Sequence, residues 1–343
     1  MTIKKSLSCL VLAVILIRLS NLGSANAAKA LYAFGDSFVD TGNSGSGAYP
    51  YGKTWPGYPA GRASDGRVQV DYFAELFGVP SPTASLLLKN NSESLSGVNF
   101  AKGGAGVTYA YGMTPLDRQV NELESLVEKN VLSKSHLRKS VALVSLGVND
   151  YSAYNAYQSS KKSEYASEVE STVTTIVDGI ALNLVRLYGF GFRNVVIANL
   201  ANMVCSPHIT VAANFSSCSS NSTLEYESST HNELLQQRVR LLNHELQGAN
   251  FIIVDQSKAF EHLFYNGAQY GFENPLVPCC TWYNDSAGQT QYTLCQHPEK
   301  AVIFDGIHPT QAAWKVVINL YASVRGYTQE GPNLNAWIQR NKV

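Results

Sequence analysis

Short apolar runs alternate along the chain with longer stretches in which apolar residues recur every three or four positions. The runs at residues 31–34, 141–146, 194–200 and 251–254 have the length of strands buried on both faces. The helical stripes comprise Leu116, Val120, Leu123 and Val127; Val169, Val173, Ile176, Val177, Ile180, Leu184 and Leu187; and Leu234, Leu235, Val239, Leu242 and Leu246. Strands that alternate with helices predict a parallel sheet with helices on both faces.

The first apolar run ends in Gly35, Asp36 and Ser37, and a polar, Gly-rich stretch follows. In a parallel α/β sheet, the residues just beyond the carboxyl end of a strand face the ligand crevice. A serine at that point is a candidate nucleophile, with its hydroxyl directed outward and its backbone N–H free. The alternative interpretation is that Asp36 and Ser37 only cap the next helix, a position that both residue types favour.

A second candidate group lies near the other end of the chain, where Asp305 and His308 follow an apolar run and precede Pro309. Serine hydrolysis requires a base that takes the hydroxyl proton and an acidic group that holds this base in the correct tautomer. The two residues are close enough in sequence for one loop to supply both groups. A core or surface histidine is the competing interpretation for His308.

Several other motifs of catalysis and binding do not match the sequence. Ser37 lacks the G-x-S-x-G pattern of α/β-hydrolases because Val39 occupies the final position. The glycines of residues 103–106 lack the pattern of a phosphate-binding loop, and Tyr109 replaces the third glycine of a dinucleotide fingerprint, so a plain turn is the alternative. The cysteines lack zinc-ligand spacing and no H-E-x-x-H occurs. We therefore expect neither a metal nor a cofactor.

Four short blocks occur in order along the chain and resemble those of the GDSL esterase/lipase family, also called SGNH hydrolases, in its secreted plant-type branch. The blocks are residues 35–42, 99–106, 147–150 and 305–310, and residues 61–67 are also similar to this branch. Each block alone is a weak signal, but four in this order and at these separations are a strong one, and the resemblance extends over nearly the whole mature chain. Phe38 replaces the leucine that gives the family its name, an apolar exchange beyond the nucleophile.

The resemblance implies a single domain of residues 28–343 with a three-layer α/β/α sandwich, a central parallel sheet and a flavodoxin-like arrangement. It implies that Ser37 attacks the acyl carbon of an ester, that His308 takes and returns the proton, and that Asp305 orients His308. The expected activity is that of a secreted esterase or lipase acting on a small-molecule or lipid ester. An acyltransferase with an alcohol acceptor and an inactive secreted binding protein of the same fold are the alternatives.

The resemblance also implies an oxyanion hole. Its donors would be the backbone N–H groups of Ser37 and Gly104 and the side-chain amide of Asn149, and Gly104 aligns better with the family's glycine than Gly103 does. Glycine suits this position because the backbone must approach the substrate with no side chain between them. A turn residue after a strand is the alternative interpretation for Asn149.

The N-terminus resembles a signal peptide. Lys4 and Lys5 precede an apolar run at residues 7–17, and residues 25–27 supply small residues for cleavage, so we expect residues 1–27 to be removed and the protein to be secreted. Eleven apolar residues are too few to cross a hydrocarbon core of about 30 Å as a helix, and we expect no later stretch to be long and apolar enough to span a membrane.

Charge and composition narrow the possible partners. The formal net charge of the full chain is zero, and residues 1–27 contain three basic residues and no acidic one. The remainder has 23 basic and 26 acidic residues, a net charge of about −3. We expect no nucleic-acid partner, which would normally require a basic patch. We also expect a monomer.

Five cysteines remain after removal of the predicted signal peptide, so at most two disulfides form. The short interval favours Cys205–Cys218. Cys295 should pair with one of the adjacent Cys279 and Cys280, and Cys280 is our candidate. The glycosylation candidates in a secreted chain are the sequons at Asn90, Asn214, Asn221 and Asn284, of which we expect two or three to be used.

Aromatic residues in the loops at residues 49–58 and 107–114 indicate an apolar or sugar-stacking substrate cleft, although ordinary surface tyrosines would produce the same pattern. The natural ester does not follow from the sequence.

Overall fold

The computed structural model describes residues 28–161 and 166–343, and the predicted signal peptide lies outside these ranges. The strands of the main sheet are β1 (Leu31–Gly35), β2 (Thr83–Ala84), β3 (Val98–Asn99), β4 (Val141–Ser145), β5 (Asn194–Ala198), β6 (Asn250–Val254) and β9 (Thr328–Gln329). They are ordered β2-β3-β1-β4-β5-β6-β9. Every pair of neighbours is parallel except β6 and β9.

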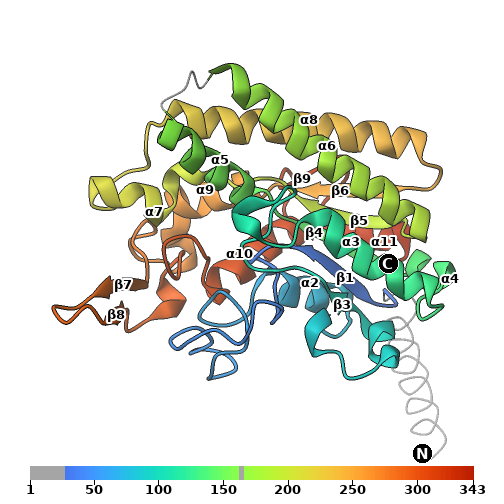
Figure 1. Cartoon of the computed structure of the whole chain (residues 1–343), viewed down its shortest axis with the longest axis horizontal. Helices are drawn as coiled ribbons and strands as arrows, with labels where there is room; N and C mark the ends of the chain where they lie inside the picture. Colours follow the sequence, from blue (N-terminus) through green and yellow to red (C-terminus); the bar gives the residue numbers. More distant parts are fainter. Residues whose placement is uncertain (1–27, 162–165) are drawn as a thin grey trace, which may run out of the picture.

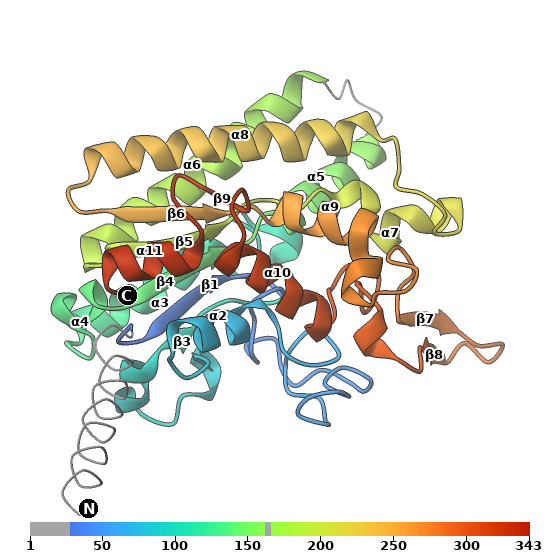
Figure 2. The same ribbon diagram turned by 180° about the vertical axis from the view of Figure 1, so that it is seen from behind.

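The helices cover both faces of this sheet (Figures 1 and 2). They are α2 (Gln69–Phe77), α3 (Leu116–Glu128), α4 (Lys134–Arg138), α5 (Val148–Lys161), α6 (Ala166–Phe190), α7 (Pro207–Thr210), α8 (Ser222–Glu245), α9 (Gln256–Asn266), α10 (Gln311–Ser323) and α11 (Leu334–Asn341). Short 3₁₀ turns lie in the connections: η1 (Ser85–Leu87), η2 (Asn91–Ser96), η3 (Ala110–Gly112), η4 (Met203–Cys205), η5 (Val211–Ala213), η6 (Gly267–Tyr270) and η7 (Pro298–Lys300).

Side chains of the central strands alternate between two hydrophobic cores, as a strand period of two requires. Leu31 and Ala33 of β1 enter the core shared with α2, α9, α10 and α11, whereas Tyr32 and Phe34 enter the core shared with α3, α6 and α8. Because both faces are buried, the strands are continuous apolar runs. The predicted α/β/α sandwich is confirmed, and the order β3-β1-β4-β5-β6 is the flavodoxin-like one.

The predicted helical stripes correspond to the buried faces of α3, α6 and α8. In α6, residues Val173, Ile176, Val177, Ile180 and Leu184 are buried against the sheet. Residues Glu168–Phe190 of this helix are nevertheless long and apolar enough, by length and composition alone, to cross a membrane. The prediction that no later stretch is long and apolar enough to span a membrane was therefore wrong, and packing against the sheet accounts for the apolar residues of α6.

A two-stranded hairpin, β7 (Cys280–Asn284) and β8 (Thr290–Leu294), projects from the sandwich (Figure 1). Cys279 and Cys295 form a disulfide across its base, with a Cα–Cα distance of 4.8 Å. Cys280 is a free, buried thiol, so the candidate pair Cys280–Cys295 was wrong. Adjacent residues of an extended segment point to opposite sides, and only Cys279 faces Cys295. The predicted Cys205–Cys218 disulfide is present.

The four sequon asparagines, Asn90, Asn214, Asn221 and Asn284, all have exposed side chains. Two of them also cap helices through their side-chain oxygens. Asn90 accepts from backbone N–H groups of η2, and Asn221 does the same at the start of α8. Capping uses Oδ1, whereas a glycan would be attached to the amide nitrogen, which in Asn90 donates to Oε1 of Glu93 at 3.2 Å. That two or three of the four sequons are glycosylated stays a prediction.

Candidate active site

Ser37 lies in a tight turn directly after β1. Gly35 closes the strand with a φ of +156°, and a Cβ atom there would lie 2.1 Å from the carbonyl oxygen of Ser145 in β4. Only glycine fits this approach. Asp36 next to it accepts a hydrogen bond from the N–H of Phe38 at 3.0 Å, which stabilises the turn. No helix begins at this turn, because the next helix along the chain is α2, so the interpretation that Asp36 and Ser37 only cap a helix was wrong. The turn places Ser37 at the carboxyl edge of the sheet.

His308 and Asp305 reach Ser37 from a turn near the end of the chain. The backbone N–H of Phe304 donates to the carbonyl of His308 at 2.7 Å, which closes this turn just before α10. Nε2 of His308 lies 2.8 Å from Oγ of Ser37, and Nδ1 lies 2.7 Å from Oδ2 of Asp305. The three residues predicted from the sequence are thus brought together in one chain of hydrogen bonds.

Asp305 is held on both of its oxygens. Oδ1 accepts from the backbone N–H groups of Ile307 and His308, each at 2.8 Å, while Oδ2 faces the imidazole. Burial alone would raise the pKa of Asp305, but the charge of His308 and these donors lower it well below its ordinary value. The carboxylate is therefore ionised and fixed at neutral pH.

The pKa of the His308 imidazole shifts in the opposite direction to that of Asp305. Burial disfavours the charged ring, but the neighbouring Asp305, with Asp36 farther away, raises the pKa of His308 above its ordinary value. Burial also raises the pKa of Asp36 to about 7. His308 therefore gains a proton more readily than a free histidine, which is the property required of a base that passes through the imidazolium state.

Two backbone N–H groups, one in the turn of Ser37 and one in the glycine-rich loop, are unoccupied in the described residues. Within residues 28–161 and 166–343, the N–H groups of Ser37 and Gly104 donate no hydrogen bond in the structure. Gly103, by contrast, donates its N–H to Asp40 at 3.0 Å and to Ser44 at 2.7 Å. Gly104 has a φ of +80°, which glycine adopts readily. This difference favours Gly104 over Gly103 as an oxyanion donor.

Asn149 lies in the first turn of α5, next to the glycine-rich loop. Its Nδ2 donates to the carbonyl oxygen of Ala105 at 2.9 Å, which uses one of the two amide hydrogens. The neighbouring Asp150 is buried and accepts from the N–H of Val107 and from the N–H and hydroxyl of Thr108. The third block thus anchors the second. The sequence placed Asp150 in a block but did not reveal this anchoring role.

Tyr51 is the contact that sequence reasoning missed. Its hydroxyl donates to Oδ2 of Asp305 at 2.7 Å, and its ring packs on Phe304 and Trp282. The aromatic content of the loop at residues 49–58 was the available signal, but it suggested a substrate cleft rather than a bond to the acidic residue.

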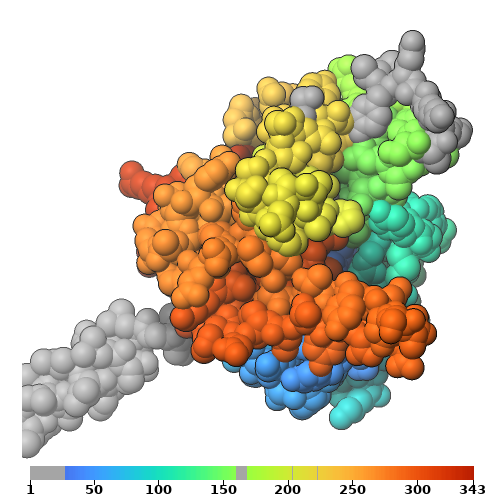
Figure 3. Space-filling model, turned by 90° about the vertical axis from the view of Figure 1, so that its left-hand side faces the viewer, coloured from blue at the N-terminus to red at the C-terminus, as the bar shows by residue number. Residues whose placement is uncertain are grey.

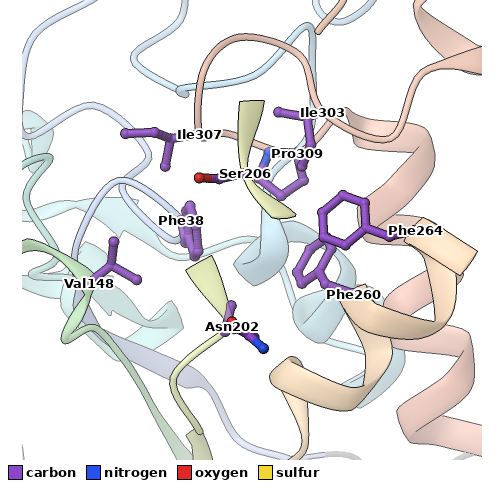
Figure 4. Close-up of a pocket in the computed structure, with 10 residues that line it drawn as sticks. Phe38, Val148, Asn202, Ser206, Phe260, Phe264, Ile303, Ile307 and Pro309 are labelled. Atoms are coloured by element: carbon purple, nitrogen blue, oxygen red, sulfur yellow. The ribbon is translucent and has the colours of Figure 1, made fainter. Parts of the chain in front are cut away.

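A small apolar cavity lies on one flank of the candidate site (Figure 4). Its walls include the immediate neighbours of three predicted site residues: Phe38 follows Ser37, Val148 precedes Asn149, and Ile307 precedes His308. Phe260 and Phe264 of α9 close the opposite side. The volume of this cavity is about 40 Å³. A larger polar depression, with a volume of about 600 Å³, shares the wall residues Asn202 and Phe264 with the apolar cavity.

Within the described ranges, no group of three or more histidine, cysteine, aspartate or glutamate residues is placed to hold a metal ion. A serine hydrogen-bonded to a partly buried histidine, which is bonded in turn to a buried carboxylate, is the arrangement typical of serine-dependent acyl hydrolases.

Comparison with known proteins identifies the family. The family model described as GDSL-like Lipase/Acylhydrolase matches residues 31–320, and the chain belongs to this family. GDSL esterase/lipase At5g03610 of Arabidopsis thaliana is 36% identical over 84% of this chain and 85% of the relative. GDSL esterase/lipase At3g09930 of the same plant is 34% identical, covering 84% and 86%. Acetylajmalan esterase 2 of Rauvolfia serpentina is 28% identical, covering 84% and 88%. The chain is a carboxylic ester hydrolase.

Proposed function

We propose that the protein is a secreted serine esterase that works through an acyl-enzyme on Ser37. His308 removes the hydroxyl proton while Oγ attacks the acyl carbon, and it then returns the proton to the departing alcohol oxygen. In the second half, His308 takes a proton from water while the water oxygen attacks the acyl carbon. His308 then returns this proton to Oγ of Ser37 as the bond from Oγ to the acyl carbon breaks, which releases the acid and restores the serine. The observation that carries this proposal is the 2.8 Å contact between Nε2 of His308 and Oγ of Ser37.

Asp305 holds His308 with Nε2 toward the serine and stabilises the imidazolium formed during each proton transfer. The support for this role is its bond to Nδ1 at 2.7 Å together with the two backbone donors that fix its other oxygen. A protonated Asp305 could not act in this way, and the lowered pKa keeps it ionised across the neutral range.

Negative charge that develops on the substrate oxygen is met by the N–H groups of Ser37 and Gly104 and by the remaining amide hydrogen of Asn149. Preorganised donors of this kind stabilise the transition state more than the ground state. The two free N–H groups support this assignment, as does the bond from Asn149 to Ala105, which fixes the orientation of the amide.

The apolar cavity suits the acyl group of the substrate. A single water needs roughly 10–15 Å³ of such space, so about 40 Å³ accommodates three or four groups of that size. An acyl chain from acetyl to butyryl fits this volume. We assign the substrate class as short-chain carboxylic esters.

Secretion accords with the two disulfides, because disulfides persist in oxidising compartments. The sequence pattern of residues 1–27 provides the corresponding signal. N-terminal sequencing of the protein secreted by a eukaryotic host would find a start near Ala28 if this assignment is correct, and an uncleaved N-terminus would contradict it.

Replacement of the nucleophile tests the mechanism. Ser37→Ala should abolish p-nitrophenyl butyrate hydrolysis and labelling by a fluorophosphonate probe, while the melting temperature stays nearly unchanged. Loss of a nucleophile that leaves the oxyanion donors intact retains a rate of about 10³–10⁴ over water. Ser46→Ala, an exposed serine in the same segment, is the matched control. Turnover above a few per cent of wild type in Ser37→Ala would refute the assignment. Product analysis with added alcohols separates hydrolysis from acyl transfer.

A further inference from the structure

Tyr51 is the only described residue besides His308 whose side chain bonds to the carboxylate of Asp305. Its hydroxyl donates at 2.7 Å to Oδ2, the same oxygen that accepts from Nδ1 of His308 at 2.7 Å. The two donors therefore share the negative charge of one oxygen atom. The other oxygen is already occupied by two backbone N–H groups.

The ring of Tyr51 is held from two sides. It packs edge-on against Phe304, at a centroid distance of 5.4 Å, and is stacked on Trp282 of β7 at 6.3 Å. The hairpin is itself fixed to the segment before Asp305, because the N–H groups of Cys279 and Cys280 donate to the carbonyls of Ile303 and Phe304. Figure 3 shows the hairpin, in orange, lying over the loop near residue 50, in blue. The hydroxyl is thus held in place by packing on both sides of its ring.

We propose that Tyr51 is a positioning residue that tunes the histidine of the site through Asp305, a role that rests on the proposed function of the triad. The hydrogen bond from Tyr51 to Oδ2 of Asp305 withdraws negative charge that would otherwise stabilise the imidazolium form of His308. With Tyr51 in place, His308 is less basic than an undivided carboxylate would make it. The base then remains unprotonated to a lower pH, and the enzyme keeps its activity over a wider acidic range.

Three other ionisable groups among the described residues surround the pair, and of these Cys280 also acts on Tyr51. Asp36, after β1, acts on His308, and Asp150 of α5 acts on Asp36. Cys280 faces Asp305 from β7, and burial together with that carboxylate raises the pKa of the thiol to about 11, so it is neutral below pH 9. Because Asp36 titrates near neutral pH, the test must observe His308 itself rather than activity alone.

The experiment is an NMR titration of side-chain-labelled histidine in wild type, Tyr51→Phe and Tyr283→Phe, with His308 assigned by loss of its signal in His308→Gln. Tyr51→Phe keeps the ring and removes only the donor. We expect the pKa of His308 to rise by about 0.5–1 pH unit, and the acidic limb of kcat/KM to move up equally with little change in KM. Tyr283 is an exposed hairpin tyrosine, and its variant should show neither effect.

If Tyr51 had a purely structural role, its replacement would lower kcat by the same factor at every pH and leave the pKa of His308 unchanged. An unchanged His308 pKa, within 0.2 units, in folded Tyr51→Phe therefore overturns the proposal. If Tyr51→Phe does not fold, 3-fluorotyrosine at this position is the second test: its more acidic hydroxyl should lower the pKa of His308, and no shift refutes the role. The titration needs no turnover, so absence of esterase activity would refute the proposed function separately.

Discussion

Phe264 separates the small apolar cavity from the larger polar depression, since its side chain lines both. Replacement by alanine removes an aromatic ring from that wall and joins the two spaces. If the cavity receives the acyl group, the substitution should lengthen the acyl chain that the enzyme prefers. Phe264 touches no residue of the proposed triad through a hydrogen bond in the structure's described residues, so the chemical step should remain intact.

The size of the effect follows from the space available. Wild type accommodates about three or four water-sized groups, so methylenes beyond butyryl gain no burial. Each methylene newly buried in Phe264→Ala contributes about 0.8 kcal/mol, or roughly fourfold in kcat/KM. Octanoate has four more methylenes than butyrate. If two or three become buried, the ratio of kcat/KM for octanoate to that for butyrate should rise by about 15- to 60-fold.

The assay is hydrolysis of p-nitrophenyl esters from acetate to decanoate, with substrate below KM. Tyr265→Ala is the control, because Tyr265 is the next residue on α9 and lines only the polar depression. It should leave the ratio within twofold of wild type. Should folded and active Phe264→Ala also leave the ratio within twofold, the apolar cavity would not be the acyl site, and short-chain specificity would need another origin.

The remaining predictions concern the oxyanion hole, the acid of the triad and one disulfide. Asn149→Ala should lower kcat by about 10²–10³ with little change in KM, and higher pH should not restore it. Asp305→Asn should cost up to about 10⁴ in kcat and be partly rescued at high pH, where hydroxide assists deprotonation of the serine. An identical pH response in pH–rate profiles of the two variants would argue against separate roles. Cys205→Ser with Cys218→Ser opens a loop with a sequence separation of 13 and should lower the free energy of unfolding by about 3 kcal/mol in urea titrations. A loss below 1 kcal/mol would show that the loop is constrained by other contacts.

The central sheet could be predicted because its strands are buried on both faces. The strands at residues 141–146 and 251–254 could be recognised from local sequence alone, since a continuous apolar run of this length is typical of a strand buried on both faces. The edges were different. β2, β3 and β9 have only two residues each, too short to show a period, and they exist because neighbouring strands supply their hydrogen bonds. Their pairing depends on tertiary contacts that local patterns do not encode.

The candidate site likewise contains residues that could be predicted from the sequence and others that could not. Ser37, Asp305 and His308 carry chemistry that few other positions require, so residue type and block spacing were enough to propose them. Gly104 could be preferred to Gly103 only by alignment, whereas the structure supplies a physical reason: Asp40 and Ser44 occupy the N–H of Gly103. The spacing of glycines shows that a backbone approaches closely but not which N–H remains free.

Tyr51 and Cys280 show why the surroundings of Asp305 were beyond the sequence. Tyr51 and Asp305 are 254 positions apart, and a tyrosine hydroxyl has no preferred partner that a motif could reveal. Cys279 and Cys280 have nearly equal separations from Cys295, so spacing cannot choose between them, whereas the pleat of β7 can. Once Cys279 takes the disulfide, Cys280 must point inward beside Phe304, which brings Trp282 against Tyr51. The choice of cysteine and the bond to Asp305 are therefore consequences of one packing arrangement, in which the hairpin determines where the hydroxyl of Tyr51 lies.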